Sequence, residues 1–584
     1  AQSTDRLFTI GANGGTLDAS GTGTLTWSGN GTGSANAIAR TNSTSPTLTL
    51  SGTGIASMAS IWANALTSGT SALTKTGTGT WQISASNTYT GVTNINNGTL
   101  QLGNASAFSS STAITINTNG ALDLNGLTVS RSITLNGGAL TNSNTTTTAI
   151  IGNAITITLT ADSTLMAATG ATLQLGSGGS AAPISGAFAI RIGNSSNRGD
   201  VKFQNSSCTY TGGTTIDYGR LLLRTYFAAP STNFVGPGAV TVNANGTFDN
   251  FDYSVPNAIT LNGGILSASS PNSNGVFTGV VTLTADSTIA GYTMQPGTSS
   301  SSVLLQISGG IVGNFGLTIG TSDHQGRVYF YAPTAPNVYS YSGSTIVAYG
   351  VLAPYDVTAL NSSSLVRVDT NGALMLPSYT TFSKAFTLNG GTFIAASGTS
   401  TTTVSSAITL TADSKIAVAN GGSGALTFNS TSTISGDYSL TYGIASTTAY
   451  AGGTTATSYN GTITVGGNNS YKGLTNIALG KVILGATGSG ANSPLGTVDG
   501  GTVVNTGAVL DLNGKNLVTA EPLTISGTGI SNSGALMNGV STAATYSGLL
   551  TLGATSSVIA GSGTIALTNP GIITGAGFEL KLGG

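Results

Sequence analysis

The chain has 584 residues, of which 6% are charged, and its formal net charge is −1. Soluble domains carry roughly 25% charged residues, so the composition excludes an ordinary charged globular surface. It also lacks the basic surplus that a nucleic-acid partner requires. Hydrophobic residues make up 39%, more than is typical of a disordered chain. We therefore expect a folded chain with an uncharged polar surface and, without an 18-residue apolar window, no membrane insertion.

The N-terminus and its first segments give two expectations. The chain begins Ala1-Gln2 without Met, which fits a mature product after signal-peptide removal and favours secretion. In residues 55–66, IASMASIWANAL, the apolar Ile55, Met58, Trp62 and Leu66 follow helical spacing. This segment therefore predicts one short helix.

Elsewhere the chain predicts short β-strands. Alternating runs such as TLQL, AITIN and SITLN are bounded by Gly, Asn and Ser. Alternation with period two indicates strands, and the bounding residues indicate turns. Strands of four to six residues are expected along most of the chain.

The chain also repeats itself. The motif Tyr-x-Gly-x-Thr starts at Tyr89, Tyr210, Tyr341 and Tyr471, and LNGG and LTADS phrases follow it in the same order within the units. We divide residues 1–584 into a partial N-terminal repeat, 1–86, and four repeats, 87–207, 208–336, 337–466 and 467–584. The tyrosines are predicted structural anchors.

One aspartate recurs at an equivalent position of three repeats. Asp162, Asp286 and Asp413 each end an LTAD phrase. A residue that recurs once per unit is better explained as a turn former than as a catalyst, because Asp accepts hydrogen bonds from nearby backbone N–H groups. We therefore assign these three residues a structural role.

Stacked turns explain the composition better than a sandwich or barrel does. In a parallel β-solenoid each turn pairs with the next, so like side chains lie above one another. Like charges directly opposite each other destabilise paired strands, whereas Thr, Ser and Asn do not repel. The fold class is therefore predicted to be all-β, a parallel β-helix built from long internal repeats. Turns of about 20 residues would give nearly 30 of them.

The segment from Leu73 to Gly103 carries a denser pattern. Its marks are Lys75, Gly77, Gly79, Trp81, Asn87, Thr88, Tyr89, Gly91, Gly98, Thr99 and Leu100. This segment resembles the autotransporter-associated β-strand repeat, a passenger-associated motif of large secreted bacterial proteins, and the other units resemble it in part. The resemblance implies a right-handed β-helix, export to the cell surface, and a role in adhesion or surface architecture.

Residues suited to catalysis are few. His324 is the only histidine and lies with Asp323 in a polar stretch, interpreted as a turn. Asp249 and Asp252 form the closest carboxylate pair outside the repeated positions, a weak candidate for a catalytic or calcium site. Cys208 is the only cysteine and is expected to be a small buried apolar residue. No catalytic residue, metal site or cofactor is predicted.

Aromatic residues gather in the middle of the chain, where 22 of the 38 lie between residues 203 and 386. Inward stacking explains most of them. The remainder are candidates for an exposed face that binds glycans or a partner. The candidates are Tyr329, Tyr331, Tyr339, Tyr341 and Tyr349.

The two ends of the chain lack strongly charged caps, which solenoids normally carry. We therefore favour a secreted structural protein that adds end to end into a surface filament, with residues 1–12 as a candidate exchanged strand. A monomeric autotransporter-type passenger adhesin that binds glycans or the surfaces of a host or neighbouring cell is the alternative. A polysaccharide-active enzyme is a minor one.

Overall fold

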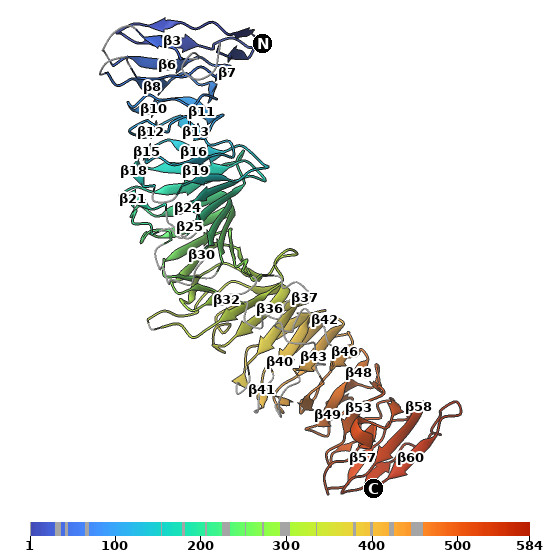
Figure 1. Ribbon diagram of the computed structural model, residues 1–584. Coiled ribbons are helices and arrows are strands. Elements are labelled where there is room, and N and C mark those ends of the chain that lie inside the picture. Colours follow the sequence, from blue (N-terminus) through green and yellow to red (C-terminus); the bar gives the residue numbers. More distant parts are fainter. Residues whose placement is uncertain are drawn as a thin grey trace. The chain divides into compact units, whose positions relative to one another are not determined.

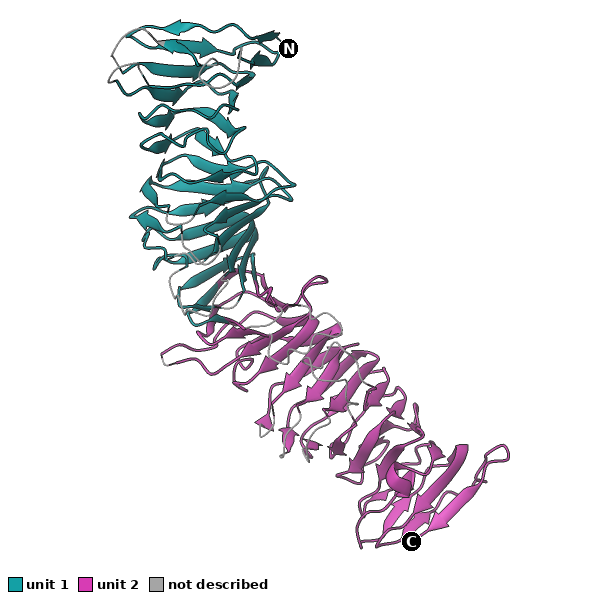
Figure 2. Ribbon diagram, in the orientation of Figure 1, with its two compact units in different colours: residues 1–266, 276–282 teal, residues 267–275, 283–584 magenta. Residues whose placement is uncertain are grey.

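The computed structural model is all-β: its short parallel strands stack in successive turns of a solenoid, which we call the coil (Figure 1). The structure describes residues 2–29, 37–40, 45–64, 69–152, 155–177, 182–204, 207–224, 234–251, 253–270, 274–292, 304–334, 336–377, 381–396, 401–419, 425–445 and 460–584. Among these residues one helical element occurs, the 3-10 turn η2 (Ile530–Asn532). The contacts between residues separate the chain into two compact units. Unit 1 comprises residues 1–266 and 276–282, and unit 2 comprises residues 267–275 and 283–584 (Figure 2).

The short helix predicted over residues 55–66 is wrong. Ile55–Met58 form strand β7, which pairs in parallel with β9 (Thr80–Ile83). Ile55 is 61% exposed while Met58 is fully buried, as alternation along a strand requires. Trp62 is buried beyond the end of β7, and Leu66 lies outside the described residues.

Unit 1 builds one face of its coil from a purely parallel eight-stranded sheet. In sheet order its strands are β3 (Gly15–Asp18), β6 (Thr47–Ser51), β8 (Ala72–Lys75), β10 (Thr93–Ile95), β12 (Ile114–Asn117), β15 (Ile133–Asn136), β18 (Ile157–Ala161) and β21 (Ile184–Gly186). A second parallel face includes β13 (Gly120–Asp123), β16 (Ala139–Asn142), β19 (Ser163–Ala167), β22 (Ile190–Ile192), β24 (Thr214–Arg224), β25 (Val240–Asn250) and β27 (Ile259–Asn262).

Unit 2 repeats this plan. One parallel face contains β34 (Leu317–Ile319), β36 (Thr345–Pro354), β37 (Val366–Leu376), β39 (Phe386–Asn389), β42 (Ile408–Ala412) and β45 (Ile434–Ser435). The next face contains β40 (Thr392–Ala395), β43 (Ser414–Val418), β46 (Leu440–Tyr442), β48 (Thr475–Ile477), β52 (Thr502–Val504), β55 (Leu523–Gly527) and β58 (Leu550–Ile559).

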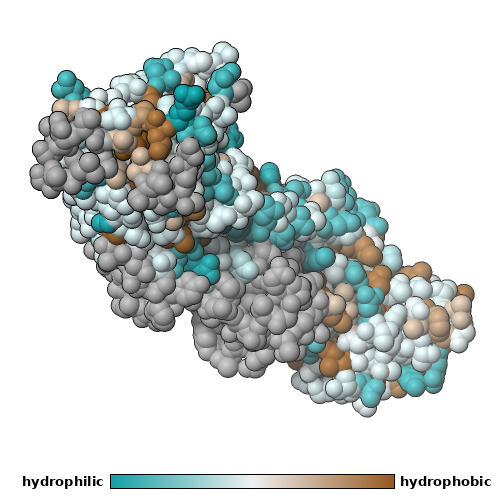
Figure 3. Space-filling model, turned by 45° about the horizontal axis from the view of Figure 1, so that its top comes forward, coloured by the Kyte–Doolittle hydropathy of each residue, from teal (hydrophilic) through white to brown (hydrophobic). Residues whose placement is uncertain are grey.

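The core consists of ladders of like residues. Ile114, Ile133, Ile157 and Ile184 occupy paired positions of four successive turns, and all four are buried. The threonines that alternate with them point outward and pair with one another in the same way. Where Figure 3 colours the surface, pale areas of intermediate hydropathy are interspersed with hydrophilic and hydrophobic ones. This arrangement confirms the predicted parallel β-solenoid; its right-handedness and the repeat boundaries stay predictions.

The coil has about 21 turns, fewer than the nearly 30 predicted. Turn length varies: Ala121 pairs with Ala139, 18 residues later, whereas Leu440 pairs with Thr475, 35 residues later. The repeated strands fix only the stacked faces, and the connections between faces tolerate insertions because they lie outside the ladders.

A substitution at the glycine of the Tyr-x-Gly-x-Thr motif would test how closely the turns stack. A Cβ on Gly212 would overlap the backbone of Phe188 and Ala189 in the preceding turn. We expect Gly212→Ala to destabilise unit 1 by about 2 kcal/mol or more, because the turns must separate. Gly21→Ala is the control, since a Cβ there meets only one atom, at 4.0 Å. Equal thermal unfolding of the two variants would contradict the stacking argument.

Candidate functional site

The four motif tyrosines are buried structural anchors. Each phenol hydroxyl bonds the hydroxyl of the threonine four residues later, at 2.5 to 2.6 Å. The pairs are Tyr89 with Thr93, Tyr210 with Thr214, Tyr341 with Thr345 and Tyr471 with Thr475. All four side chains are at most 1% exposed, and burial raises the pKa of each phenol above its usual value. They are neutral hydrogen-bonding groups inside the coil.

The hydrogen bonds of the Tyr89 anchor extend to the next turn. The Thr93 and Ser111 hydroxyls bond each other at 3.0 Å, and Ser111 donates to the carbonyl of Gly91 at 2.9 Å. Trp81 is fully buried in β9, where its indole N–H donates to the carbonyl of Ser51 at 2.7 Å. The dense pattern of this segment therefore serves packing between turns.

The repeated aspartates bond backbone N–H groups of the next turn. A carboxylate oxygen of Asp162 accepts from Ala189 N–H at 2.8 Å, and Asp413 accepts from Ser439 N–H at 2.8 Å. Asp286 accepts from Gly316 N–H at 2.6 Å. Each aspartate thus connects two turns rather than closing its own turn.

An exposed aromatic residue precedes each of these N–H groups, and the sequence analysis did not identify it. Phe188, Phe315 and Tyr438 are 39%, 42% and 43% exposed. Their segments share the pattern Ile-x-Gly-x-aromatic, ISGAF, IVGNF and ISGDY. Alignment of the repeats on their LTAD phrases would have revealed this pattern. It recurs once per repeat at one corner of the coil.

Three tyrosines form an aromatic cluster on unit 2. The rings of Tyr331 and Tyr355 are stacked, with centroids 4.8 Å apart and planes 7° apart. Tyr329 contacts both, at 5.9 and 4.9 Å, and its hydroxyl accepts a hydrogen bond from Arg327 at 3.2 Å. Tyr355 is 44% exposed, whereas Tyr329 is buried. Burial and the neighbouring tyrosines raise the pKa of Tyr355 to about 12, so it remains a neutral ring at physiological pH.

The other tyrosines of the predicted ligand face do not join this cluster. Tyr341 is the inward anchor described above, and Tyr339 is buried, its hydroxyl donating to the carbonyls of Ile307 and Tyr331. Tyr349 is half-buried in β36, and no ring contact to the cluster is found among the described residues. Of the five tyrosines predicted as a ligand face, Tyr329 and Tyr331 therefore lie in the cluster, and the other three do not.

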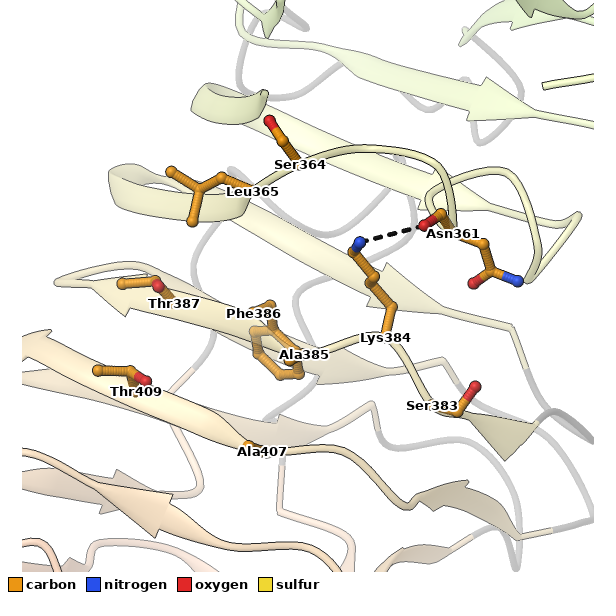
Figure 4. Close-up of a pocket in the computed structure, with 10 residues that line it drawn as sticks. All are labelled: Asn361, Ser364, Leu365, Ser383, Lys384, Ala385, Phe386, Thr387, Ala407 and Thr409. Atoms are coloured by element: carbon orange, nitrogen blue, oxygen red, sulfur yellow. Dashed lines mark hydrogen bonds between the residues drawn. The ribbon is translucent and has the colours of Figure 1, made fainter. Parts of the chain in front are cut away.

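An open pocket of about 450 Å³ lies beside β39 and β42 (Figure 4). The Lys384 ammonium group at its edge donates to the backbone carbonyls of Asn361, at 3.1 Å, and Ser363. The remaining lining consists mainly of Ser, Thr and Ala side chains with Leu365 and Phe386. The Lys384 ammonium already bonds carbonyls of the preceding turn. The residues that line this pocket include no Asp, Glu or His to pair with it in acid–base chemistry.

Lys75 is a charged residue inside the coil. It is fully buried at the end of β8, and its ammonium donates to the carbonyls of Thr76, Gly77 and Asn97 at 2.5, 2.8 and 3.1 Å. Burial lowers its pKa to about 8. The three carbonyls belong to turns at a corner of the coil, so Lys75 holds these turns together by hydrogen bonds.

Glu521 is the buried acid of unit 2. Its two carboxyl oxygens accept hydrogen bonds from Ser493 at 3.0 Å and from Thr502 at 2.5 Å, and all three side chains are buried. Burial raises the pKa of Glu521 to about 7 despite these donors. The nearby Tyr471 and Tyr546 have pKa values raised far above that range, so they stay neutral there.

The remaining candidates occupy structural positions. Asp249 is buried and pairs with Arg220 at 3.2 Å, and the same guanidinium pairs with Asp200 at 2.6 Å; its predicted companion Asp252 lies outside the described residues. His324 closes a tight turn by hydrogen bonds to the backbone of Thr321.

Cys208 is fully buried, and burial raises the pKa of its thiol to about 12. A thiol with that pKa is almost entirely protonated at neutral pH, which makes it a poor nucleophile. In the described part of the chain no three His, Cys, Asp or Glu side chains gather as a metal site would require. The described residues also contain no helix with the length and apolar character to cross a bilayer.

One family model matches two short segments of the chain. The model of the passenger-associated transport repeat matches residues 73–102 and 205–223, the segments that hold Trp81, Tyr89 and Tyr210. No curated protein and no solved structure is significantly similar to the chain. Over those two segments the chain carries the repeat of autotransporter passengers, and its β-solenoid fold agrees with that similarity.

The buried acid predicts a pH dependence of unit 2. The folded pKa of Glu521 exceeds the unfolded value, so the folded chain holds more protons and its stability falls as pH rises from about 4.5 to about 7. We expect Glu521→Gln to remove this fall and to stabilise unit 2 at pH 8 by at most about 3 kcal/mol.

Denaturant unfolding as a function of pH measures the difference. Glu579, the other glutamate, has a side chain 64% exposed, and Glu579→Gln is the matched control. A wild-type stability that rises between pH 5 and 7 relative to the Glu521→Gln variant would overturn the assignment.

Proposed function

Because the chain carries passenger-associated transport repeats on a parallel β-solenoid, we propose that it is an extracellular structural protein without enzymatic activity, which assembles end to end into surface filaments. The similarity to passengers supports a secreted or surface location. The buried or ion-paired state of Asp249, Cys208 and Glu521 supports a structural role, because catalysis needs such groups accessible to substrate.

The observation that carries the assembly proposal is the pair of unpaired strand edges. At the N-terminal end β1 (Gln2–Thr4) pairs with β4 (Leu25–Trp27) on one side. At the C-terminal end β60 (Leu580–Gly583) pairs with β58 on one side. Among the described residues neither edge strand has a second neighbour. Parallel strands add in one direction, so the free edge of β60 is complementary to that of β1 of another copy.

Exposed apolar side chains accompany these edges. Leu7 is 38% exposed near the first edge, and Leu582 and Ile572 are 73% and 83% exposed at the last. Burial of such residues between copies would favour association, and the low charge opposes it little. A head-to-tail contact of this kind does not close, so it propagates.

Assembly is tested by electron microscopy and sedimentation across a dilution series. We expect filaments that lengthen with concentration, and we expect Leu582→Lys to shorten them because a charge then occupies the apolar edge. Val338→Lys, at a residue 50% exposed and many turns from either edge strand, is the control. Particles of constant size at every concentration would overturn the proposal.

A second candidate function, glycan adhesion, rests on the tyrosine cluster. The stacked Tyr331 and Tyr355 rings offer an exposed aromatic surface beside Arg327, a combination suited to sugar rings and their hydroxyls.

On an oligosaccharide array we expect Tyr355→Ala to reduce binding at least about tenfold if this cluster is the site. Tyr438→Ala, at a residue equally exposed but outside the cluster, is the control. Equal binding by both variants would exclude the cluster.

A further inference from the structure

The tyrosine cluster of unit 2 joins two successive turns of the coil. Strand β35 (Arg327–Phe330) pairs in parallel with the end of β36, and Phe330 lies opposite Pro354. The next residue after each of these is a tyrosine, Tyr331 in one turn and Tyr355 in the other. Because the pairing is parallel and in register, the two side chains start from equivalent positions of neighbouring turns.

The relative angles of the three rings distinguish one pair. The planes of Tyr331 and Tyr355 differ by 7°, with centroids 4.8 Å apart. Tyr329 is as close to Tyr355, at 4.9 Å, but its plane is tilted by 41°, and its plane is tilted by 47° against Tyr331. All three distances are usual for aromatic contacts. Within the cluster, only Tyr331 and Tyr355 therefore present their ring faces to each other.

Backbone hydrogen bonds between turns hold both of these tyrosines. The N–H group of Tyr331 donates to the carbonyl of Ile307 in the preceding turn at 2.9 Å. Directly after Tyr355, the N–H group of Asp356 donates to the carbonyl of Phe330 at 2.9 Å. The two rings thus extend from backbone positions that the stacking of turns fixes.

The stacked pair is also the accessible part of the cluster. Tyr355 is 44% exposed and Tyr331 is partly buried, whereas Tyr329 is 7% exposed. The hydroxyl of Tyr329 accepts a hydrogen bond from Arg327 at 3.2 Å. A reagent in solution can therefore reach the stacked pair more readily than the third ring.

We propose that Tyr331 and Tyr355 form a site of oxidative cross-linking, at which a peroxidase that uses hydrogen peroxide joins the two rings into dityrosine. The bond would connect two successive turns covalently and would constrain the unfolded chain as a disulfide does. Cys208 is the only cysteine, so no disulfide can do this within the chain. The inference depends neither on filament assembly nor on glycan binding.

One molecule of hydrogen peroxide balances the reaction. Each phenol gives up one electron and its hydroxyl proton and becomes a phenoxyl radical. The peroxide takes up the two electrons and the two protons and becomes two water molecules. The two radicals combine in a bond between the carbons ortho to their oxygens, and the hydrogen on each of these carbons then moves to the oxygen. Both phenols are restored, and the protein has lost two hydrogen atoms.

Parallel rings suit the formation of this bond. The unpaired electron of a phenoxyl radical occupies orbitals perpendicular to the ring, so the new bond forms between ring faces. Tyr331 and Tyr355 already lie face to face, whereas the ring of Tyr329 is tilted. Two reactants held in this way combine faster than reactants that must meet by diffusion. We therefore expect the bond within one chain, between positions 331 and 355.

The test treats the dilute full chain with a peroxidase and hydrogen peroxide. We expect dityrosine fluorescence from protein that still migrates as a single chain under denaturing conditions. Trypsin releases residues 328–367 as one peptide. Mass spectrometry should show that this peptide has lost two hydrogen atoms and gives no backbone fragments between positions 331 and 355.

Phenylalanine variants separate the chemistry from packing, because they keep the ring and remove the hydroxyl. Tyr331→Phe and Tyr355→Phe should each lower the yield of the cross-linked peptide at least about tenfold, since the aligned partner is lost. Tyr329→Phe, in the same cluster, and Tyr438→Phe, at a tyrosine 43% exposed outside it, are the controls and should leave the yield unchanged. A bond mapped to Tyr329, bonds between chains only, or an unmodified peptide overturns the proposal.

Filament formation and glycan binding are measured separately, on protein that has not been oxidised. The Tyr331→Phe and Tyr355→Phe chains should still form filaments, because the edge strands are unchanged. Cross-linking without filaments, or filaments without cross-linking, thus distinguishes this proposal from end-to-end assembly.

Discussion

The structure depends on one constraint: each turn of the coil supplies the hydrogen-bonding partners and the apolar floor for the next. Parallel pairing with register such as Ile114 on Ile133 places like side chains above one another at many positions, where like charges directly opposite each other would repel. This explains the 6% charge content. A side chain inside a ladder also has neighbours above and below it, which shield it from solvent.

The exceptions show how a buried charge is tolerated in this coil. Lys75 faces three carbonyls of corner turns, and Glu521 faces two hydroxyls. Neither has an oppositely charged partner among these contacts, and burial shifts both pKa values toward neutrality. Such groups make the stacking of turns sensitive to pH. The family model of the passenger-associated repeat matches the segment that holds Lys75 and Trp81. The residues of this segment thus serve packing between turns.

The corners of the coil are where aromatic side chains stay exposed. Inside the chain a Tyr-x-Gly-x-Thr turn covers each Ile-x-Gly-x-aromatic corner, and the aromatic residue stays partly exposed at the rim. The same contacts between neighbouring turns therefore recur from copy to copy, as expected of a repeat fold in which each unit packs on its neighbours.

By itself the sequence predicted the parallel stacking and most of the strand character, because period-two alternation and approximate repeats constrain many turns at once. It did not determine the number of turns, since insertions between faces change length without changing the ladders. It predicted a helix at 55–66 from spacing alone, where pairing with β9 imposes a strand. Only the tertiary structure decided which tyrosines meet, placing Tyr355 with Tyr331 and turning Tyr341 inward. It also decided that Asp162 serves the following turn, because contacts between residues about 25 apart depend on how the coil closes.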